Sequence, residues 1–220
     1  MSTHPFAYGP SVTIWAKEIN NLIGGEGDTI RSCTEKMKSQ MEQLTQPDVW
    51  TGSAAVQNFS NFMQTENALI SFANEFGEKF TSAVKNTNDA VEQLELGNLA
   101  QNTNISGIMD SLSFNQLSAM AEANINKETV LYNYNVIAQI GTELATIQTQ
   151  LETINSSLLA KINQLDDGSA MWDGNSAESA RESLSEVLNT NMPKIFENLN
   201  ICIRNISAAA EAAKVADSAQ

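Results

Sequence analysis

Apolar residues recur at intervals of three and four along most of this chain, and that spacing places side chains on one face of an α-helix. The pattern forms four long segments, and the stretches that separate them contain glycine or proline. In the first two segments the apolar positions are Ile30, Cys33, Met37, Met41, Leu44, and then Phe59, Phe62, Leu69, Ala73, Phe76, Phe80, Val84, Val91 and Leu94. In the last two they are Ile137, Ile140, Leu144, Ile147, Leu151, Ile154, Leu158, Leu165, and then Ala180, Leu184, Val187, Ile195, Leu199, Ile203 and Ile206. The sequence therefore predicts an all-α protein built mainly from four long helices.

The same short motif, Trp-X-Gly, stands inside two of these interruptions. It occurs as Trp50-Thr51-Gly52 between the first and second segments, and as Trp172-Asp173-Gly174 between the third and fourth. Glycine adopts a positive φ without a Cβ penalty, which suits a tight connection between helices. We expect each motif to join two helices into a hairpin, and each tryptophan ring to close that hairpin as a buried plug. The alternative is that one ring stays exposed to bind a partner.

Residues beside the two turns have the composition of helix ends. Pro47 and Gly168 are predicted to end the incoming helices. Ser53 can cap the outgoing helix of the first hairpin, and Asn175-Ser176-Ala177-Glu178 forms a capping box for the second. Asp166-Asp167, just before the second turn, is expected to be a solvated pair of carboxylates. The chain is thus predicted to be a tandem repeat of a helical hairpin.

Two helical hairpins around Trp-X-Gly turns, in an acidic chain with only two cysteines, resemble the WXG superfamily of small early-secreted-antigen proteins. Members of that family leave Gram-positive bacteria through type VII secretion systems. The resemblance covers roughly residues 28–100 and 128–216. Most family members carry one hairpin and pair as antiparallel dimers. The resemblance therefore implies that the two hairpins here form one elongated antiparallel four-helix bundle, a monomeric pseudo-dimer, although a homodimer is also compatible with it.

The resemblance implies a function in binding. It implies an exported substrate of a type VII (ESX-like) pathway, or a targeting chaperone for a larger toxin, that contacts the secretion machinery or a co-secreted effector through its helices. It also implies secretion from the cytoplasm without a cleavable signal peptide. The family often carries a Tyr-X-X-X-Asp/Glu export signal after its second helix, and none of Tyr8, Tyr132 and Tyr134 follows a second helix in that way. The pattern therefore does not indicate whether the protein is exported alone.

The helical pattern divides the chain into four regions. They are an N-terminal extension with a short helix (1–27), the first hairpin (28–100), a connector with a short helix (101–127) and the second hairpin (128–220).

Several boundaries and packing positions follow from this division. Residues 1–10 are expected to be loose or extended. Trp15, on the helix that follows, is expected to pack on the body of the protein. The less favoured alternative is that Trp15 is an exposed anchor for a partner. The second hairpin should begin near Lys127. Pro193 should kink its last helix, which is expected to fray after Val215.

The composition narrows the range of partners. The chain has 220 residues and a formal net charge of −14. This charge disfavours nucleic acid and anionic membranes, which need Lys and Arg to meet phosphates, so charged partners should be basic proteins. No apolar run reaches the ~18 residues of a membrane span. Cys33 and Cys202 lie on apolar stripes and are expected to be buried free thiols.

No catalytic, cofactor or metal site is predicted. The only histidine, His4, lies in the N-terminal extension, which argues against His-based triads and multi-His metal sites. Gly24-Gly25-Glu26-Gly27 lacks the lysine of a phosphate-binding loop. We therefore expect a protein that is not an enzyme. Two other functions stay open: a non-secreted helical adaptor, which the helical pattern supports equally well, and a pore-forming helical toxin, which would need a long apolar hairpin.

Overall fold

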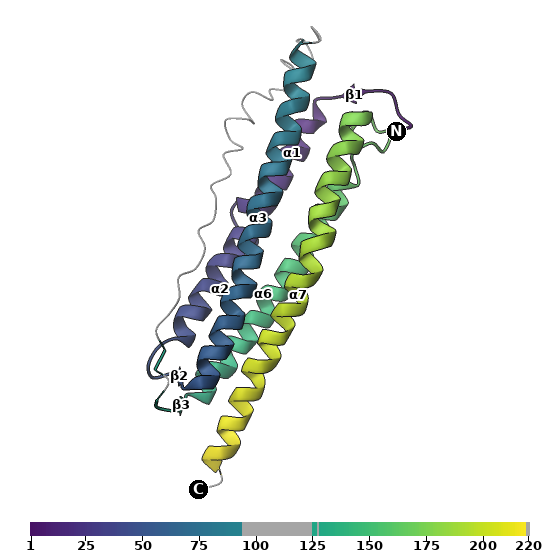
Figure 1. Cartoon of the computed structure of the whole chain (residues 1–220). Coiled ribbons are helices and arrows are strands. Elements are labelled where there is room, and N and C mark those ends of the chain that lie inside the picture. The colour runs from purple at the N-terminus through teal and green to yellow at the C-terminus, as the bar shows by residue number, and fades with distance from the viewer. Residues whose placement is uncertain (94–124, 127, 219–220) are drawn as a thin grey trace. The chain divides into compact units, whose positions relative to one another are not determined.

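The computed structural model describes residues 1–93, 125–126 and 128–218, and these residues are mostly helical (Figure 1). The helices are α1 (Ser11–Gly24), α2 (Ile30–Leu44), α3 (Ser53–Gln93), α6 (Tyr134–Ile162) and α7 (Asn175–Ser218). Four two-residue strands accompany them: β1 (Ala7–Tyr8), β2 (Trp50–Thr51), β3 (Leu131–Tyr132) and β4 (Trp172–Asp173). The all-α prediction is confirmed at this level. The predicted connector helix, and the end of the first hairpin beyond residue 93, lie outside the described residues.

Three helix ends differ from the sequence-based expectations. The helix of the second hairpin begins at Tyr134 rather than near Lys127, because Leu131 and Tyr132 are extended in β3. Helix α6 ends at Ile162, six residues before Gly168, and a loop leads from there to the second turn. Helix α7 continues to Ser218 instead of fraying after Val215. Pro193 lies inside α7, and the kink expected there stays a prediction.

The chain divides into two compact units, which are described separately below. Among the described residues, the first unit contains 1–31, 72–93 and 153–190. The second contains 32–71, 125–126, 128–152 and 191–218. Each Trp-X-Gly turn therefore belongs to a different unit, and α3, α6 and α7 contribute to both.

In the first unit, α1 lies against both α3 and α6. Trp15 of α1 is 2% exposed, and its ring centroid lies 5.7 Å from that of Phe80 on α3. The Trp15 Nε1 donates a 2.8 Å hydrogen bond to the backbone oxygen of Lys161 on α6. The Lys161 Nζ in turn pairs with Glu18 Oε2 of α1 at 2.6 Å. Trp15 is therefore packed into the protein, as the favoured expectation had it.

The core of the second unit is formed by the apolar stripes of four helices. Thr65 of α3 and Cys202 of α7 meet there, with their Oγ1 and Sγ atoms 3.6 Å apart. Cys33 and Cys202 are both buried and neither forms a disulfide, which confirms the expectation for the two thiols. Most of the predicted core positions in this unit are buried. They are Cys33, Met37, Met41, Leu44, Phe59, Phe62, Leu69, Ile137, Ile140, Leu144, Ile147, Leu151, Ile195, Leu199 and Ile206. None of the described helices is long and apolar enough to cross a lipid bilayer.

Candidate functional site: two clasped turns

Each Trp-X-Gly turn is held by a short extended segment that comes from far away in the sequence. We call each pair of turn and segment a clasp. In the Trp172 clasp, β4 pairs antiparallel with β1, so that Tyr8 lies opposite Trp172 and Ala7 opposite Asp173. The Gly9 N–H extends this pairing with a 2.7 Å hydrogen bond to the Met171 backbone oxygen. The first ten residues are therefore anchored to the second hairpin, and of the two expectations for them, loose or extended, the strand β1 fits the extended one.

The Trp172 ring is fully buried between aromatic neighbours. Its centroid lies 5.5 Å from that of Tyr8 and 5.7 Å from that of Trp15, and both pairs meet edge to face. Such pairs add about 0.5–1.5 kcal/mol each beyond the burial of their area. The indole Nε1 donates a 3.0 Å hydrogen bond to Ser176 Oγ in the first turn of α7. The ring thus has the burial and the satisfied polar atom of a structural plug.

Gly174 is required both by its backbone conformation and by the segment that lies against it. Its φ is +99°, which L side chains rarely adopt. A Cβ built on Gly174 would stand 2.9 Å from the Cα of Phe6, the residue before β1. The expected capping box does not form beside it, because the Glu178 N–H donates to the Gly174 backbone oxygen at 3.0 Å. The positive φ expected for this glycine is observed, and its second role, in letting β1 approach, is new.

Asp166 is buried whereas Asp167 is exposed, so the expectation of a solvated carboxylate pair is wrong for the first of the two. The residue is 6% exposed, and its Oδ1 accepts hydrogen bonds from Ser2 Oγ at 2.6 Å and from the Gly174 N–H at 2.9 Å. His4 Nδ1 lies 3.3 Å from the same oxygen. Hydrogen bonds, first from the Ser2 hydroxyl and then from the Gly174 N–H, lower the pKa of Asp166 below its ordinary value. Asp166 therefore ties the N-terminal segment to the turn.

Asp173, the middle residue of the motif, is also buried, and it organises the loop before the turn. Its Oδ1 accepts a 2.9 Å hydrogen bond from the Gly168 N–H, and its Oδ2 a 2.7 Å one from the Ala170 N–H. Ligand atoms of His4, Asp166 and Asp173 lie within 4.8 Å of one another, so this group could hold a metal ion. The hydrogen bonds to both carboxylates already explain why they are buried. We therefore assign them a structural role.

The Trp50 clasp repeats the main contacts of the Trp172 clasp. Strand β2 pairs antiparallel with β3, and Tyr132 lies opposite Trp50 with ring centroids 5.6 Å apart. The Asn133 N–H donates a 2.7 Å hydrogen bond to the Val49 backbone oxygen, in the manner of Gly9 and Met171. Trp50 is fully buried, and Gly52 has a φ of +100°.

The Trp50 clasp differs in the polar groups that surround it. Thr51 Oγ1 donates a 2.6 Å hydrogen bond to the Thr129 backbone oxygen, so the strand is held by a hydroxyl where the other clasp uses carboxylates. The Trp50 Nε1 has no hydrogen-bond partner within the described part of the chain. The position that corresponds to Ser176 is occupied here by Ala54, which offers no acceptor. The first turn therefore buries an unsatisfied donor.

The extended segments were missed by sequence reasoning, although the sequence contains a signal for them. Both segments have two apolar residues followed by a tyrosine, and both lie shortly before a helix. They are Phe6-Ala7-Tyr8-Gly9 and Val130-Leu131-Tyr132-Asn133. Each clasp thus joins the turn of one hairpin with the segment that leads into the other. The four motif residues Trp50, Gly52, Trp172 and Gly174 form two separate and similar sites.

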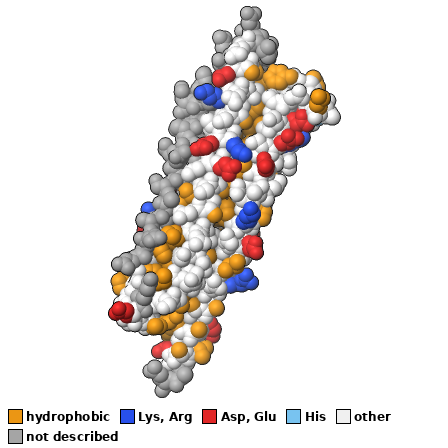
Figure 2. Space-filling model, in the orientation of Figure 1, with side chains coloured by type: hydrophobic (Ala, Val, Ile, Leu, Met, Phe, Trp, Pro, Cys, Tyr) orange, Lys and Arg blue, Asp and Glu red, His pale blue; other side chains and the backbone are white. Residues whose placement is uncertain are grey.

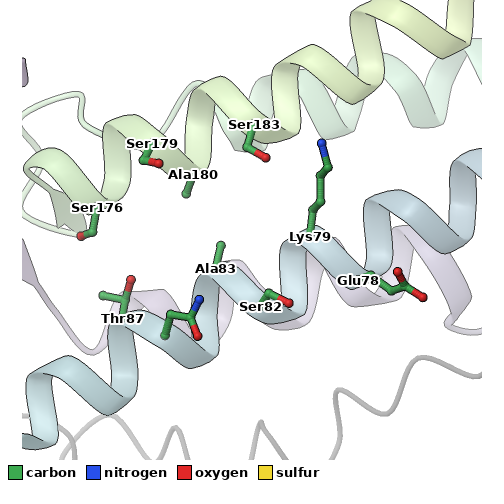
Figure 3. A pocket seen from close by; sticks show the side chains of 10 residues that line it. Glu78, Lys79, Ser82, Ala83, Thr87, Ser176, Ser179, Ala180 and Ser183 are labelled. Carbon is green, nitrogen blue, oxygen red and sulfur yellow. The ribbon is translucent and has the colours of Figure 1, made fainter.

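A groove lies beside the Trp172 clasp in the first unit, between α3 and the start of α7 (Figure 3). It has a volume of about 480 Å³ and is lined largely by small side chains, among them Ser82, Ala83, Ser179 and Ala180. A second hollow of about 480 Å³ shares Asn86, Thr87 and Ser176 with it and reaches His4 and Phe6. Figure 3 shows Thr87 facing Ser176 and Lys79 facing Ser183, so α3 and α7 run antiparallel along this groove.

Comparisons with known proteins identify no relative of this chain, so a proposal about its function depends on the geometry of the two clasps. No protein-family model matches the chain, and no significant match is found among curated proteins or solved structures.

Proposed function

We propose that this chain is a WXG-type protein of a type VII secretion pathway, either an exported substrate or a targeting chaperone for a larger toxin. It acts by binding other proteins through its helix surfaces, and it carries out no catalysis. The observation that carries the proposal is the doubled turn: both Trp-X-Gly motifs stand between long helices, with a buried tryptophan and a glycine of positive φ. Two turns that share these contacts are better explained by a repeated hairpin than by a chance occurrence of the residues.

We further propose that the two hairpins form one antiparallel four-helix bundle, a pseudo-dimer within a single chain. Each clasp takes its turn from one hairpin and its strand from the segment that leads into the other, as an antiparallel pairing requires. The antiparallel course of α3 and α7 along the groove of the first unit also supports it. The apolar stripes that single-hairpin relatives bury by dimerising are then satisfied internally, and the protein is a monomer. Light scattering after size exclusion tests this, since a mass of twice 23.9 kDa would favour the homodimer.

The charge of the chain describes the kind of partner it binds. The formal net charge is −14, and on the face seen in Figure 2 acidic and basic side chains are interspersed among many uncharged ones. A chain with this charge binds basic protein surfaces more readily than phosphates. We therefore propose a basic surface of the secretion machinery, or of a co-secreted effector, as the partner.

Secretion can be tested directly in the organism that makes the protein. The amount in culture supernatant is compared between wild-type cells and cells that lack the type VII ATPase, with a cytoplasmic enzyme as the marker for lysis. We expect the protein in the supernatant of wild-type cells only, without removal of an N-terminal signal peptide, and its return when the ATPase gene is restored.

Three results would point elsewhere. Equal amounts in both supernatants, without the lysis marker, would exclude export by this route. Absence from both supernatants, with normal levels inside the cells, would favour the non-secreted helical adaptor. Leakage of a dye from liposomes on addition of the purified protein would favour the pore-forming toxin.

A further inference from the structure

Among the described residues of the second unit, one carboxyl group is buried between the helices. Glu66 of α3 is 1% exposed, and its Oε2 has no hydrogen-bond partner within the described residues. A buried polar group without a partner costs stability, and an ionised one costs far more. Glu66 is therefore an unusual residue to find at this position.

Two charged groups of α2 act on Glu66. They are Lys38 and Glu42, which pair with each other at 4.0 Å and have side chains that are 57% and 62% exposed. Lys38 is therefore shared with an exposed carboxylate and compensates a buried charge poorly. On α7, the titratable group beside the neighbouring Thr65 is Cys202, where burial raises the pKa of the thiol and keeps it neutral.

We propose that Glu66 is a proton-operated latch in the first hairpin: α3 packs firmly beside α2 while this carboxyl is protonated, and loosens from it when the carboxyl ionises. The geometry supports this directly. The carboxyl is buried, its Oε2 has no hydrogen-bond partner among the described residues, and Lys38, the cation of α2 whose charge acts on it, is paired with Glu42 at the surface.

The direction of the pH dependence follows from the two protonation equilibria. Burial, partly offset by Lys38 and reinforced by Glu42, raises the pKa of Glu66 to about 7 in the folded protein. In the unfolded chain the group has its ordinary value of 4.5. The folded state thus binds the proton more tightly, so its stability is full below the unfolded value and is lost as the pH rises through the folded one. The carboxyl ionises in the folded protein at about pH 7, so the latch opens close to neutral pH.

The test compares thermal unfolding of the full chain and its Glu66→Gln variant by circular dichroism at constant ionic strength. We expect the wild-type midpoint to fall by about 5–10 °C between about pH 5 and about pH 8, beyond any change in the variant. Hydrogen exchange should speed up over the same range in α2 and in residues 53–71 of α3, and α1 provides the internal reference. Glu66→Leu also removes the ionisable group and should show the same flat pH profile as Glu66→Gln. If one of the two variants is too unstable to measure, the other one serves for the comparison.

A matched control addresses the charges on α2. Glu42→Gln removes the carboxylate that competes for Lys38, so it should move the wild-type transition to lower pH without abolishing it. Parallel pH profiles for the wild type and both Glu66 variants would overturn the proposal. So would faster exchange that is confined to helices other than α2 and α3.

Discussion

The difference between the two indole N–H groups allows a stability prediction with a defined sign. Trp172 Nε1 donates to Ser176 Oγ at 3.0 Å, whereas Trp50 Nε1 is buried without an acceptor in the described part of the chain, and Ala54 stands at the corresponding position. Ala54 is exposed, so a hydroxyl can be added there without overfilling the core. We expect Ala54→Ser to stabilise the protein and Ser176→Ala to destabilise it.

The magnitudes follow from the burial of the donor. A hydrogen bond contributes about 0.5–1.5 kcal/mol net, and an unsatisfied buried donor costs about 1–3 kcal/mol. Serine is a slightly poorer helix former than alanine, which offsets up to about 0.5 kcal/mol of the gain. Ala54→Ser should therefore stabilise by about 1 kcal/mol, or roughly 2–4 °C in a chain of this size. Ser176→Ala should cost about 1–2 kcal/mol.

The assay is urea unfolding followed by circular dichroism, together with the ¹⁵N-indole NMR signal of each tryptophan. The resonance of the Trp50 indole proton should shift in Ala54→Ser and stay in place in Ala54→Cys, which has a similar volume and a weak acceptor.

Removal of a whole ring gives the upper limit for the loss of stability, since Trp50→Ala and Trp172→Ala should each cost about 3–5 kcal/mol as buried plugs. A stabilising Ala54→Cys, or an Ala54→Ser without gain despite a shifted indole proton, would refute the reasoning. An unchanged melting temperature in Trp50→Ala would contradict the plug assignment.

Three further predictions test the clasps and the way the hairpins pair. Gly174→Ala should cost about 2–5 kcal/mol, from strain at positive φ and a backbone atom 2.9 Å from the new Cβ, whereas Gly27→Ala, with φ +89° and nothing within 4 Å, should cost about 1 kcal/mol in the same unfolding assay. The pKa of Asp166 is lowered in the folded state, so its contribution to the free energy of unfolding is present above its ordinary value of 3.8 and is lost as the pH falls through the folded value. In urea unfolding, Asp166→Asn should lack this loss of stability in acid. If the variant loses stability in acid as the wild type does, Asp166 does not tie the N-terminal segment to the turn. Spin labels at the exposed positions Asp48 and Ser169, after replacement of both native cysteines, should report about 50–60 Å if the hairpins pair antiparallel, and less than half of that if they pair in parallel.

The helices could be predicted from the sequence because their signal is local and repeated. The 3/4 spacing of apolar residues and the breakers between the stripes located α1, α2, α3, α6 and α7, with errors mainly at their ends. The buried tryptophans and the positive φ of Gly52 and Gly174 followed from residue chemistry in the same way. These features depend on neighbours within one or two helical turns.

The strands and the buried carboxyl groups could not be predicted in that way. A two-residue strand shows no periodicity, and the pairing of Tyr8 with Trp172 joins residues more than 160 positions apart. Asp166 has the local context of a solvated turn, and its burial depends on contacts with Ser2 and His4 from the other end of the chain. Glu66 similarly gives no local sign of the environment that α2 provides. In each case the deciding contact is non-local.

The reciprocal arrangement of the clasps makes the two halves of the chain mutually dependent. A fragment of residues 1–93 would keep the Trp50 turn but lose β3, and a fragment from residue 128 onward would keep the Trp172 turn but lose β1. Each fragment alone would expose an unpaired strand edge beside an aromatic ring, which is a recognised hazard for aggregation. Mixed together, the fragments supply each other's missing strand. Co-expression of the two pieces should therefore yield a soluble heterodimer, where either piece produced by itself would precipitate.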